Sequence, residues 1–305
     1  MTLTYIFHSG FALKTDKAVL IFDYWMDPAG VLPRLLSGAK RAYVFSSHFH
    51  EDHFTRDILR WRHDYPATDF TYILSKDILR HRRAVRDEAD VWMGKGAEWR
   101  DEFLHVVATG SNDSGVSWIV EVEGQRIFHA GDLNNWYARF LASYTPDAIV
   151  RSTEFGINVN PLAEEKRYLG ELKDIRRALN ALAPNTTDPA PRSASSSPSS
   201  LQSKASPFGM PSAKGPGEVG DACQSQNGGC QEGADFDIVM FPVDGRIGNG
   251  YTRGARQFVK QFSVRHFAPM HFVAAGFESA WRMEEYVIPP SHFWRISKDG
   301  DSYNI

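Results

Sequence analysis

Residues 46–54 read SSHFHEDHF, which places three histidines and an aspartate within a single short stretch. His48 and His50 are two residues apart, so on an extended chain both imidazoles point to the same side. Asp52 and His53 follow as the chain turns toward a helix expected to begin near Thr55. Imidazoles and carboxylates are the side chains that bind divalent metals in catalytic sites. The stretch therefore predicts a metal-binding loop.

Four ligands from one loop cannot complete the sites of two metal ions. Further ligands have to come from the ends of other predicted strands. Asp132 ends QRIFHAGD (residues 125–132), directly after a glycine that permits close approach. His271 lies at the end of the strand predicted in HFAPMHF (residues 266–272). Ligands delivered from the ends of different strands can converge on one site. We expect a centre for one or two divalent ions, with these candidate ligands: His48, His50, Asp52, His53, Asp132 and His271.

The rest of the chain alternates between strand and helix patterns. Strands are predicted in residues 4–25, 42–48, 69–74, 104–110, 116–124, 125–132, 237–241 and 266–272, from β-branched and aromatic runs bounded by polar breaks. Helical spacing is found in residues 55–65, 75–89, 163–182, 252–262 and 278–287. Strands come first in meander order and then alternate with helices. This order predicts two mixed sheets packed together, with helices outside them.

Residues 184–235 differ in composition, because Ser, Pro, Gly and Ala dominate them. Such a segment cannot bury enough apolar surface to offset its ordering entropy, so we predict a disordered insertion. One domain then consists of residues 1–183 and 236–305. A passive linker is the expected role of the insertion, and a regulatory or partner-binding segment is the alternative. Its Cys223 and Cys230 are expected to be free thiols, because the cytosol disfavours a disulfide.

Bulk composition limits the classes of partner. A hydrophobic fraction of 42% in 305 residues is enough for a substantial core, and a net charge of −3 produces no strong field toward nucleic acids or anionic membranes. No apolar run approaches the length of a membrane span, and the N-terminal residues lack the features of a signal peptide. We therefore expect a cytoplasmic protein with a small-molecule substrate, and neither a membrane nor a nucleic acid as partner.

Three motifs in order resemble the metallo-β-lactamase fold hydrolases: HxHxDH at 48–53, Gly131-Asp132 after a strand, and PMH ending at His271. The segments HSGF (residues 8–11), IFDYW (21–25) and IFHAGDLNNW (127–136) resemble, more narrowly, the branch of ascorbate 6-phosphate lactonase-like enzymes. The resemblance implies a four-layer αββα sandwich with metals at one edge between the two sheets. It also implies that Asp132 bridges two ions, one of them held by Asp52, His53 and His271.

One departure from the family pattern concerns the other ion. The family usually supplies a further histidine after the strand that corresponds to residues 104–110, where this chain reads GSNDSGVSW. Asn112, Asp113 or water would have to replace it. Zinc is the first candidate metal, but oxygen ligands are harder than imidazole and favour manganese or iron.

Further residues are expected around this centre, each with an alternative role. The resemblance suggests that Asp23 orients the histidine loop and that His8 lines the site, although a turn carboxylate and a simple loop histidine are equally credible. Arg246 is expected to pair either with an anionic substrate group or with Asp244. The expected substrate contacts are Asn134, Asn135, Trp136, Asp244 and Arg246.

The chemistry that follows is hydrolysis by a water molecule whose pKa a divalent metal lowers, with Asp52 as the proton acceptor. No GxSxG motif for a serine nucleophile is present. We predict a metal-dependent hydrolase acting on a small ester, lactone or phosphoester. The alternatives are a nuclease of the same fold acting on RNA or DNA, and a degenerate, non-catalytic metal-binding scaffold.

Overall fold

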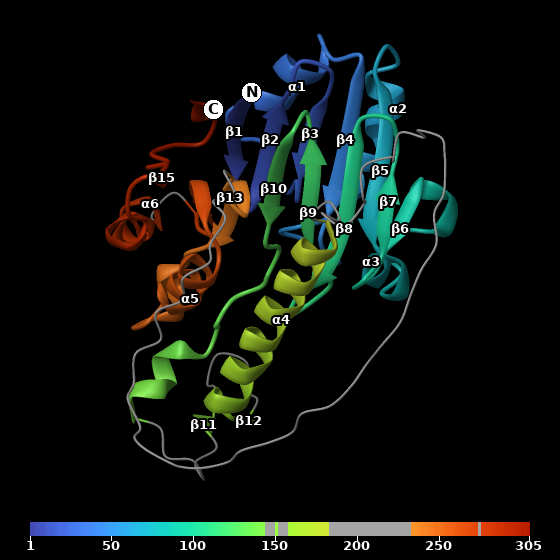
Figure 1. Cartoon of the computed structure of the whole chain (residues 1–305). Helices are drawn as coiled ribbons and strands as arrows, with labels where there is room; N and C mark the ends of the chain where they lie inside the picture. Colours follow the sequence, from blue (N-terminus) through green and yellow to red (C-terminus); the bar gives the residue numbers. More distant parts are fainter. Residues whose placement is uncertain (144–149, 152–157, 183–232, 274–275) are drawn as a thin grey trace, which may run out of the picture. The chain divides into compact units, whose positions relative to one another are not determined.

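Two seven-stranded β-sheets form the centre of the protein (Figure 1). The computed structural model describes residues 1–143, 150–151, 158–182, 233–273 and 276–305. Within these ranges, Met1–Leu182 and Ala234–Ile305 cluster into one compact unit. The predicted insertion at 184–235, including both cysteines, lies outside the described residues except for positions 233–235.

The first sheet begins as an antiparallel meander and continues as parallel strands. β1, β2 and β3 pair antiparallel, and β3 to β6 pair parallel. The C-terminal strand β16 returns to pair with β1. In spatial order the strands are β16 (Ser302–Asn304), β1 (Thr2–Phe7), β2 (Gly10–Lys14), β3 (Val19–Phe22), β4 (Arg41–Ser46), β5 (Asp69–Ser75) and β6 (Val91–Met93).

The second sheet is also mixed. Its β7 to β10 pair antiparallel, and β10, β13, β14 and β15 pair parallel. A separate short pair joins β11 (Val150–Arg151) to β12 (Asn158–Val159). In spatial order the strands are β15 (His292–Phe293), β14 (Val264–Met270), β13 (Phe236–Pro242), β10 (Gln125–His129), β9 (Val116–Val122), β8 (Leu104–Gly110) and β7 (Glu98–Arg100).

Both faces of the first sheet are buried, which explains its nearly continuous apolar strands. On β3, Leu20 and Phe22 belong to the core shared with the second sheet, whereas Val19 and Ile21 belong to a separate core on the other face. Side chains alternate in the same way on β4, where Phe45 stacks on Phe22 with ring centroids 4.8 Å apart. The period of two therefore sends each strand's side chains into two different layers.

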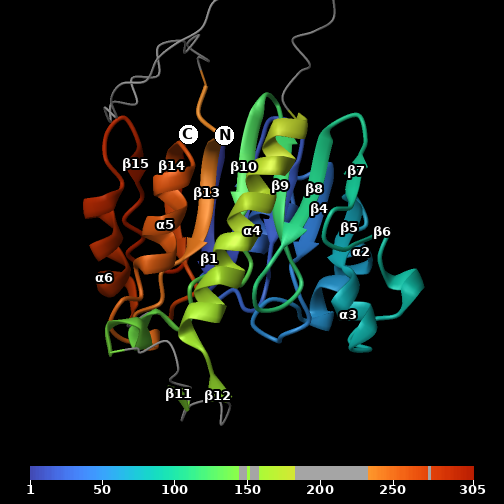
Figure 2. The ribbon, with the colours of Figure 1, turned by 60° about the horizontal axis from the view of Figure 1, so that its bottom comes forward.

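Helices cover the outer face of each sheet. Those packed on the first sheet are α1 (Val31–Leu36), the 3-10 helix η1 (Arg56–Arg60), α2 (Trp61–Asp64) and α3 (Lys76–Arg80). Over the second sheet lie α4 (Pro161–Leu182) and α5 (Arg253–Gln261), and Figure 2 shows α4 in front of the sheet near β9 and β10. A short α6 (Phe277–Ala280) and the 3-10 helix η6 (Trp281–Tyr286) follow β14. The predicted αββα sandwich is confirmed.

The helix predicted over residues 75–89 is much shorter than expected. After α3 the chain enters the left-handed region at Arg82 (φ 58°), and the backbone N–H of Arg83 donates to Ile78 O at 2.9 Å. This bond is typical of a helix end. Repulsion between neighbouring positive side chains also opposes a longer helix. Only a 3-10 turn follows, η2 (Arg86–Glu88). Among the described helices, none is long and apolar enough to cross a membrane.

Candidate metal centre

The predicted ligands lie in loops that follow the carboxyl ends of strands from both sheets. The histidine loop at 48–53 follows β4, Asp132 follows β10 and His271 follows β14. Registers such as Phe22 opposite Phe45 and Pro242 opposite Met270 align these strand ends within each sheet. The edge outside the carboxyl ends of parallel strands is where α/β proteins commonly bind ligands. The fold therefore brings together residues that are more than 200 positions apart.

Asp132 lies at the centre of the cluster. Its Oδ2 is 3.2 Å from His48 Nε2, and its Oδ1 is 3.0 Å from His53 Nε2 and 3.3 Å from His271 Nε2. The residue is only 6% exposed. Burial alone would raise the pKa of this carboxyl, but the three imidazoles hold it well below its usual value. One carboxylate thus faces three ring nitrogens, each of which is able to bind a metal.

Among the described residues, His53 Nε2 and Asp132 Oδ1 are buried polar atoms of this centre that have no hydrogen-bond partner. Such atoms are rare in folded proteins, and a cation between them would satisfy both. Ligand atoms of two further groups lie within 4.8 Å of one another: His48, His50 and Asp52 in one, and His50, Asp113 and Asp132 in the other. The donor set of imidazoles and carboxylates fits one or two divalent ions.

Of the two predicted substitutes for the absent histidine, the structure brings Asp113 rather than Asn112 to the centre. Asn112 Nδ2 donates to Asn134 O at 2.8 Å, and its Oδ1 accepts from Asn134 N at 3.1 Å, so its amide is occupied. Asp113 groups with His50 and Asp132 instead. Desolvation and the neighbouring Asp132 charge raise the pKa of Asp113. A carboxylate is therefore available where the family usually has an imidazole.

Asp52 and His8 face each other on one side of the centre. Asp52 Oδ2 is 3.2 Å from His8 Nε2 and 3.8 Å from His53 Nε2, and the Asp52 side chain is partly exposed. His8 follows the carboxyl end of β1 and is buried. Desolvation opposes ionisation of Asp52, but His8 and His53 lower its pKa well below the usual value.

Asp23, which follows β3, supports the histidine loop from behind. Its Oδ2 lies 2.7 Å from His53 Nδ1 and accepts from Ser47 Oγ at 2.5 Å, while its Oδ1 accepts from Ser47 N at 2.7 Å. Burial opposes the charged form of His53, but the carboxylates of Asp132 and Asp23 raise its pKa well above the usual value. These contacts direct His53 Nε2 toward Asp132. Ser47 was missed in the sequence, although it directly precedes His48.

Asp244 and Arg246 support His271 in the same manner. Asp244 Oδ2 is 3.0 Å from His271 Nδ1, and Arg246 donates to the same carboxylate through Nε at 2.9 Å and Nη2 at 2.7 Å. Burial would lower the pKa of His271, but Asp132 and Asp244 raise it to about 9. Burial would raise the pKa of Asp244, but His271 and Arg246 lower it to about 2. The predicted Asp244–Arg246 salt bridge is present.

Two glycines allow the chain to approach the histidine loop closely. A Cβ on Gly115 (φ 64°) would lie 2.0 Å from Ser47 O and 2.6 Å from His48 Cβ. A Cβ on Gly131 (φ 53°) would lie 2.8 Å from Val116 O and 2.9 Å from Ser47 Cβ. Both left-handed turns therefore pack against the backbone that carries the first ligand.

A cavity of about 590 Å³ opens onto the centre. Trp136 forms part of its wall, with its ring centroid 4.9 Å from that of His271 and its Nε1 donating to Asp132 O at 2.8 Å. Asn134 and Asn135 are buried and are not among the wall residues. The sequence analysis missed Tyr137, Arg139 and Ile247. The full wall consists of His50, Asp52, Asp113, Asp132, Trp136, Tyr137, Arg139, Asp244, Arg246, Ile247 and His271.

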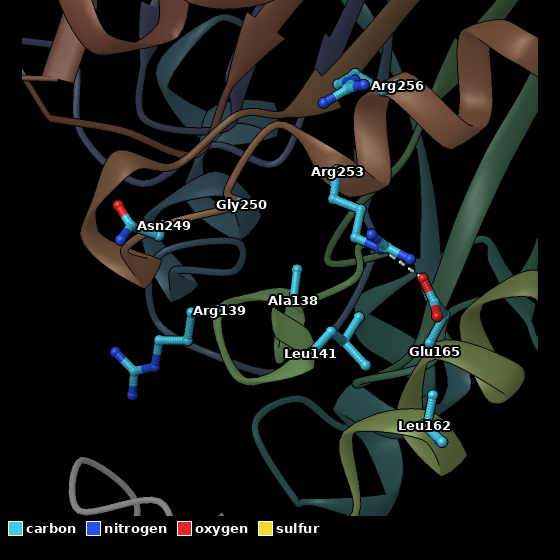
Figure 3. Close-up of a pocket in the computed structure, with 9 residues that line it drawn as sticks. All are labelled: Ala138, Arg139, Leu141, Leu162, Glu165, Asn249, Gly250, Arg253 and Arg256. Atoms are coloured by element: carbon cyan, nitrogen blue, oxygen red, sulfur yellow. Dashed lines mark hydrogen bonds and ion pairs between the residues drawn. The ribbon is translucent and has the colours of Figure 1, made fainter. Parts of the chain in front are cut away.

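A second cavity, of about 350 Å³, shares Arg139 with the first (Figure 3). Arg253 of α5 points toward Glu165 of α4, and its Nε donates to Glu165 Oε1 at 2.7 Å. The same oxygen accepts from Asn135 Nδ2 at 2.9 Å and from Gln257 Nε2 at 2.7 Å. Asn135 therefore links the loop after Asp132 to α4 and α5, and its side chain supports the packing of these elements.

Comparisons with known proteins agree with this geometry. No family model matches the chain. A UPF0173 metal-dependent hydrolase from Korarchaeum cryptofilum (strain OPF8) is 27% identical over 153 residues, which cover 48% of this chain and 67% of that protein. Igni18, a novel metallo hydrolase from the hyperthermophilic archaeon Ignicoccus hospitalis, superposes with a TM-score of 0.50 at 12% identity, covering 100% of this chain and 98% of that one. The chain is similar to these hydrolases, and its αββα sandwich is consistent with the metallo-β-lactamase fold.

The comparisons support the predicted fold and the likeness to metal-dependent hydrolases, whereas the narrower lactonase-like branch stays a prediction. The metallo-β-lactamase fold protein YhfI from Bacillus subtilis superposes with a TM-score of 0.49 at 8% identity over 100% of both chains. At 12% identity, the likeness to Igni18 concerns the fold alone.

Proposed function

We propose that this metallo-β-lactamase fold protein is a metal-dependent hydrolase that acts on a small anionic ester, lactone or phosphoester. The observation that carries the proposal is the Asp132 carboxylate, which faces the ring nitrogens of His48, His53 and His271 at 3.0–3.3 Å. The relative from Korarchaeum cryptofilum is named a metal-dependent hydrolase, and the proposal extends that activity to this chain.

The residues that would hold a first ion are His48, His50, Asp113 and Asp132, and those for a second are Asp52, His53, Asp132 and His271. A divalent ion in this centre supplies a lowered pKa for water and positive charge for the oxyanion that develops during hydrolysis. Zinc suits the imidazoles, while the carboxylate of Asp113 favours manganese or iron beside His50.

Asp52 is the proposed proton acceptor. It lines the cavity, its side chain is partly exposed, and the ion-pair neighbours of its carboxylate among the described residues are the imidazoles of His8 and His53. A water molecule attacking a substrate in the cavity would pass its proton to this carboxylate. Asp23 and Asp244 act behind the reacting groups by orienting His53 and His271.

The cavity wall supports a substrate with an anionic group and a flat or apolar portion. Arg246 keeps 56% of its side chain exposed while it binds Asp244, so its guanidinium has donors left for a second anion. Trp136 and Ile247 offer apolar surface on the same wall. Ester, lactone and phosphoester substrates with a carboxylate or phosphate all meet this description. The cytoplasmic location stays a prediction.

The proposal is tested by assaying the purified protein against p-nitrophenyl esters, a lactone panel and bis-p-nitrophenyl phosphate. Each assay follows reconstitution with Zn²⁺, Mn²⁺ or Fe²⁺. We expect hydrolysis of one class that Asp132→Asn abolishes and Asp237→Asn, a control on β13, leaves unchanged. Cleavage of RNA or single-stranded DNA instead would support the nuclease alternative. No turnover with any metal-loaded sample would support the scaffold alternative.

A further inference from the structure

His8 is a buried histidine at the edge of the metal centre. The residue is 1% exposed, and both its Nδ1 and Nε2 atoms lack partners among the described residues. Asp52 Oδ2 is 3.2 Å from Nε2, which is close enough for attraction, but the two groups are not aligned as a hydrogen bond. A buried imidazole in this state is costly unless another group occupies one of its nitrogens.

The backbone at His8 is strained in a way that serves the centre. His8 (φ 57°) and His271 (φ 68°) both adopt the left-handed conformation, and His271 N donates to His8 O at 3.0 Å. Together with Asp23 (φ 43°) they make up three of the five described non-glycine residues with positive φ. Each such residue costs roughly 1 kcal/mol or more, and strain of this kind gathers at functional sites. Here it places the ring centroids of His8 and His271 4.4 Å apart.

The ring nitrogens of His8 share one space with those of two predicted ligands. Ligand atoms of His8, Asp52, His53 and His271 all lie within 4.8 Å of one another. A catalytic divalent site takes three or more protein ligands, commonly imidazoles with a carboxylate. These four side chains form such a set, and His8 contributes its third imidazole.

We propose that His8 is itself a metal ligand, bound to the same ion as Asp52, His53 and His271. The inference rests on the proposed metal centre and deepens it. It makes the two ion sites unequal, because one then has three imidazoles, whereas the other, with Asp113, has two. Residues 110–115, after β8 of the second sheet, lack the imidazole that the family usually has. His8, after β1 of the first sheet, would supply an additional imidazole, but to the other ion. The nitrogen-rich site should bind zinc or cobalt first.

The test replaces His8 with a ligand that has a distinct optical signature. In His8→Cys loaded with Co²⁺, a thiolate on the metal gives an intense sulfur-to-cobalt charge-transfer band in the near ultraviolet. Wild type, which contains Cys223 and Cys230, provides the baseline, and His129→Cys is the matched control. His129 is equally buried, but its Nε2 lies 2.9 Å from Ser9 O. We expect the band in His8→Cys alone, saturating at one cobalt equivalent.

A His8→Cys protein that binds as much cobalt as wild type without the band would overturn the proposal. The variant His8→Gln covers poor folding of the cysteine variant, because glutamine can donate to Asp52 but does not replace imidazole on a metal. A ligand role predicts about 100-fold weaker binding of one ion in chelator competition, and retained affinity would contradict it. Wild type that binds no cobalt would instead refute the metal centre and the proposed function as a whole.

Discussion

The Nδ1 atom of His271 lies 3.0 Å from Oδ2 of Asp244, so the ring's other nitrogen, Nε2, is directed at Asp132. Arg246 binds the same Asp244 carboxylate through two nitrogens. Asp23 serves His53 in the same way from the opposite sheet, at 2.7 Å. Each of these two rings is therefore held at its Nδ1 atom by a carboxylate other than Asp132. Such contacts set the orientation and basicity of a metal-binding imidazole.

Replacing Asp244 should weaken metal binding without removing a ligand. In Asp244→Ala the His271 ring loses its orienting partner, and we expect metal affinity to fall about 10- to 100-fold, with the same number of ions bound at saturation. Asp237→Ala is the matched control, because Asp237 lies on β13, the strand that precedes Asp244, and contacts Arg126 and Arg265 instead. Chelator competition measures the affinities. Equal affinities in the two variants would show that Asp244 does not support the centre.

Replacing Asp23 should reduce stability as well as metal affinity. Asp23→Ala leaves Ser47 N and Ser47 Oγ without their buried acceptor and releases His53. Breaking a buried, charged hydrogen-bond network of this kind typically costs about 3 kcal/mol. Urea unfolding of metal-free protein measures this loss separately from metal binding. A metal-free variant as stable as wild type would mean that these bonds contribute little.

Gly115→Ala should disturb the first ligand by steric contact. The new Cβ would lie 2.0 Å from Ser47 O, so the backbone before His48 has to move. We expect destabilisation of more than about 2 kcal/mol together with weaker metal binding. Gly124→Ala is the control, because Gly124 has a similar φ of 75° with nothing within 4 Å of its Cβ position. It should show the cost of the left-handed backbone alone, about 1 kcal/mol, and wild-type metal binding. Similar metal affinities in the two variants would contradict the packing argument.

The ionised Glu165 carboxylate contributes to the free energy of unfolding, and this contribution depends on pH. Burial would raise its pKa, but Arg253, Gln257 and Asn135 lower it below its usual 4.5. A lowered folded-state pKa means that the stabilisation is fully present above pH 4.5 and is lost as pH falls through the folded-state pKa. Glu165→Gln should therefore cost about 1–2 kcal/mol at pH 7 and much less near pH 3.

The matched control is Glu164→Gln, because the Glu164 side chain pairs, within the described part of the chain, with the largely exposed Arg167 alone. Such pairs contribute about 0–1 kcal/mol, so this variant should stay close to wild type at both pH values. Urea unfolding at pH 7 and pH 3 gives the four differences needed. A Glu165→Gln penalty that does not change with pH would show that the ionised carboxylate is not the source of the stabilisation.

The local spacing of His48 to His53 was enough to predict the metal loop, because the chemistry and the turn lie within six residues. The alternatives left open were decided by contacts across the fold. Asn112 is withdrawn from the centre because its amide pairs with the backbone of Asn134. The position of Asn135 depends on its contact with Glu165 of α4, and the sequence pattern does not show where that helix packs. The orientation of His8 depends on a left-handed residue and on a backbone bond to His271, neither of which has a local sequence signal.

The most direct test of the central claim is elemental analysis of metal in purified protein, after reconstitution, for wild type and Asp132→Ala. Asp132 faces all three of His48, His53 and His271, so its loss should affect every ion of the centre. The account predicts one or two equivalents of a divalent metal in wild type and a clear loss in the variant. Wild type without metal, or a variant that retains the full amount, would contradict it.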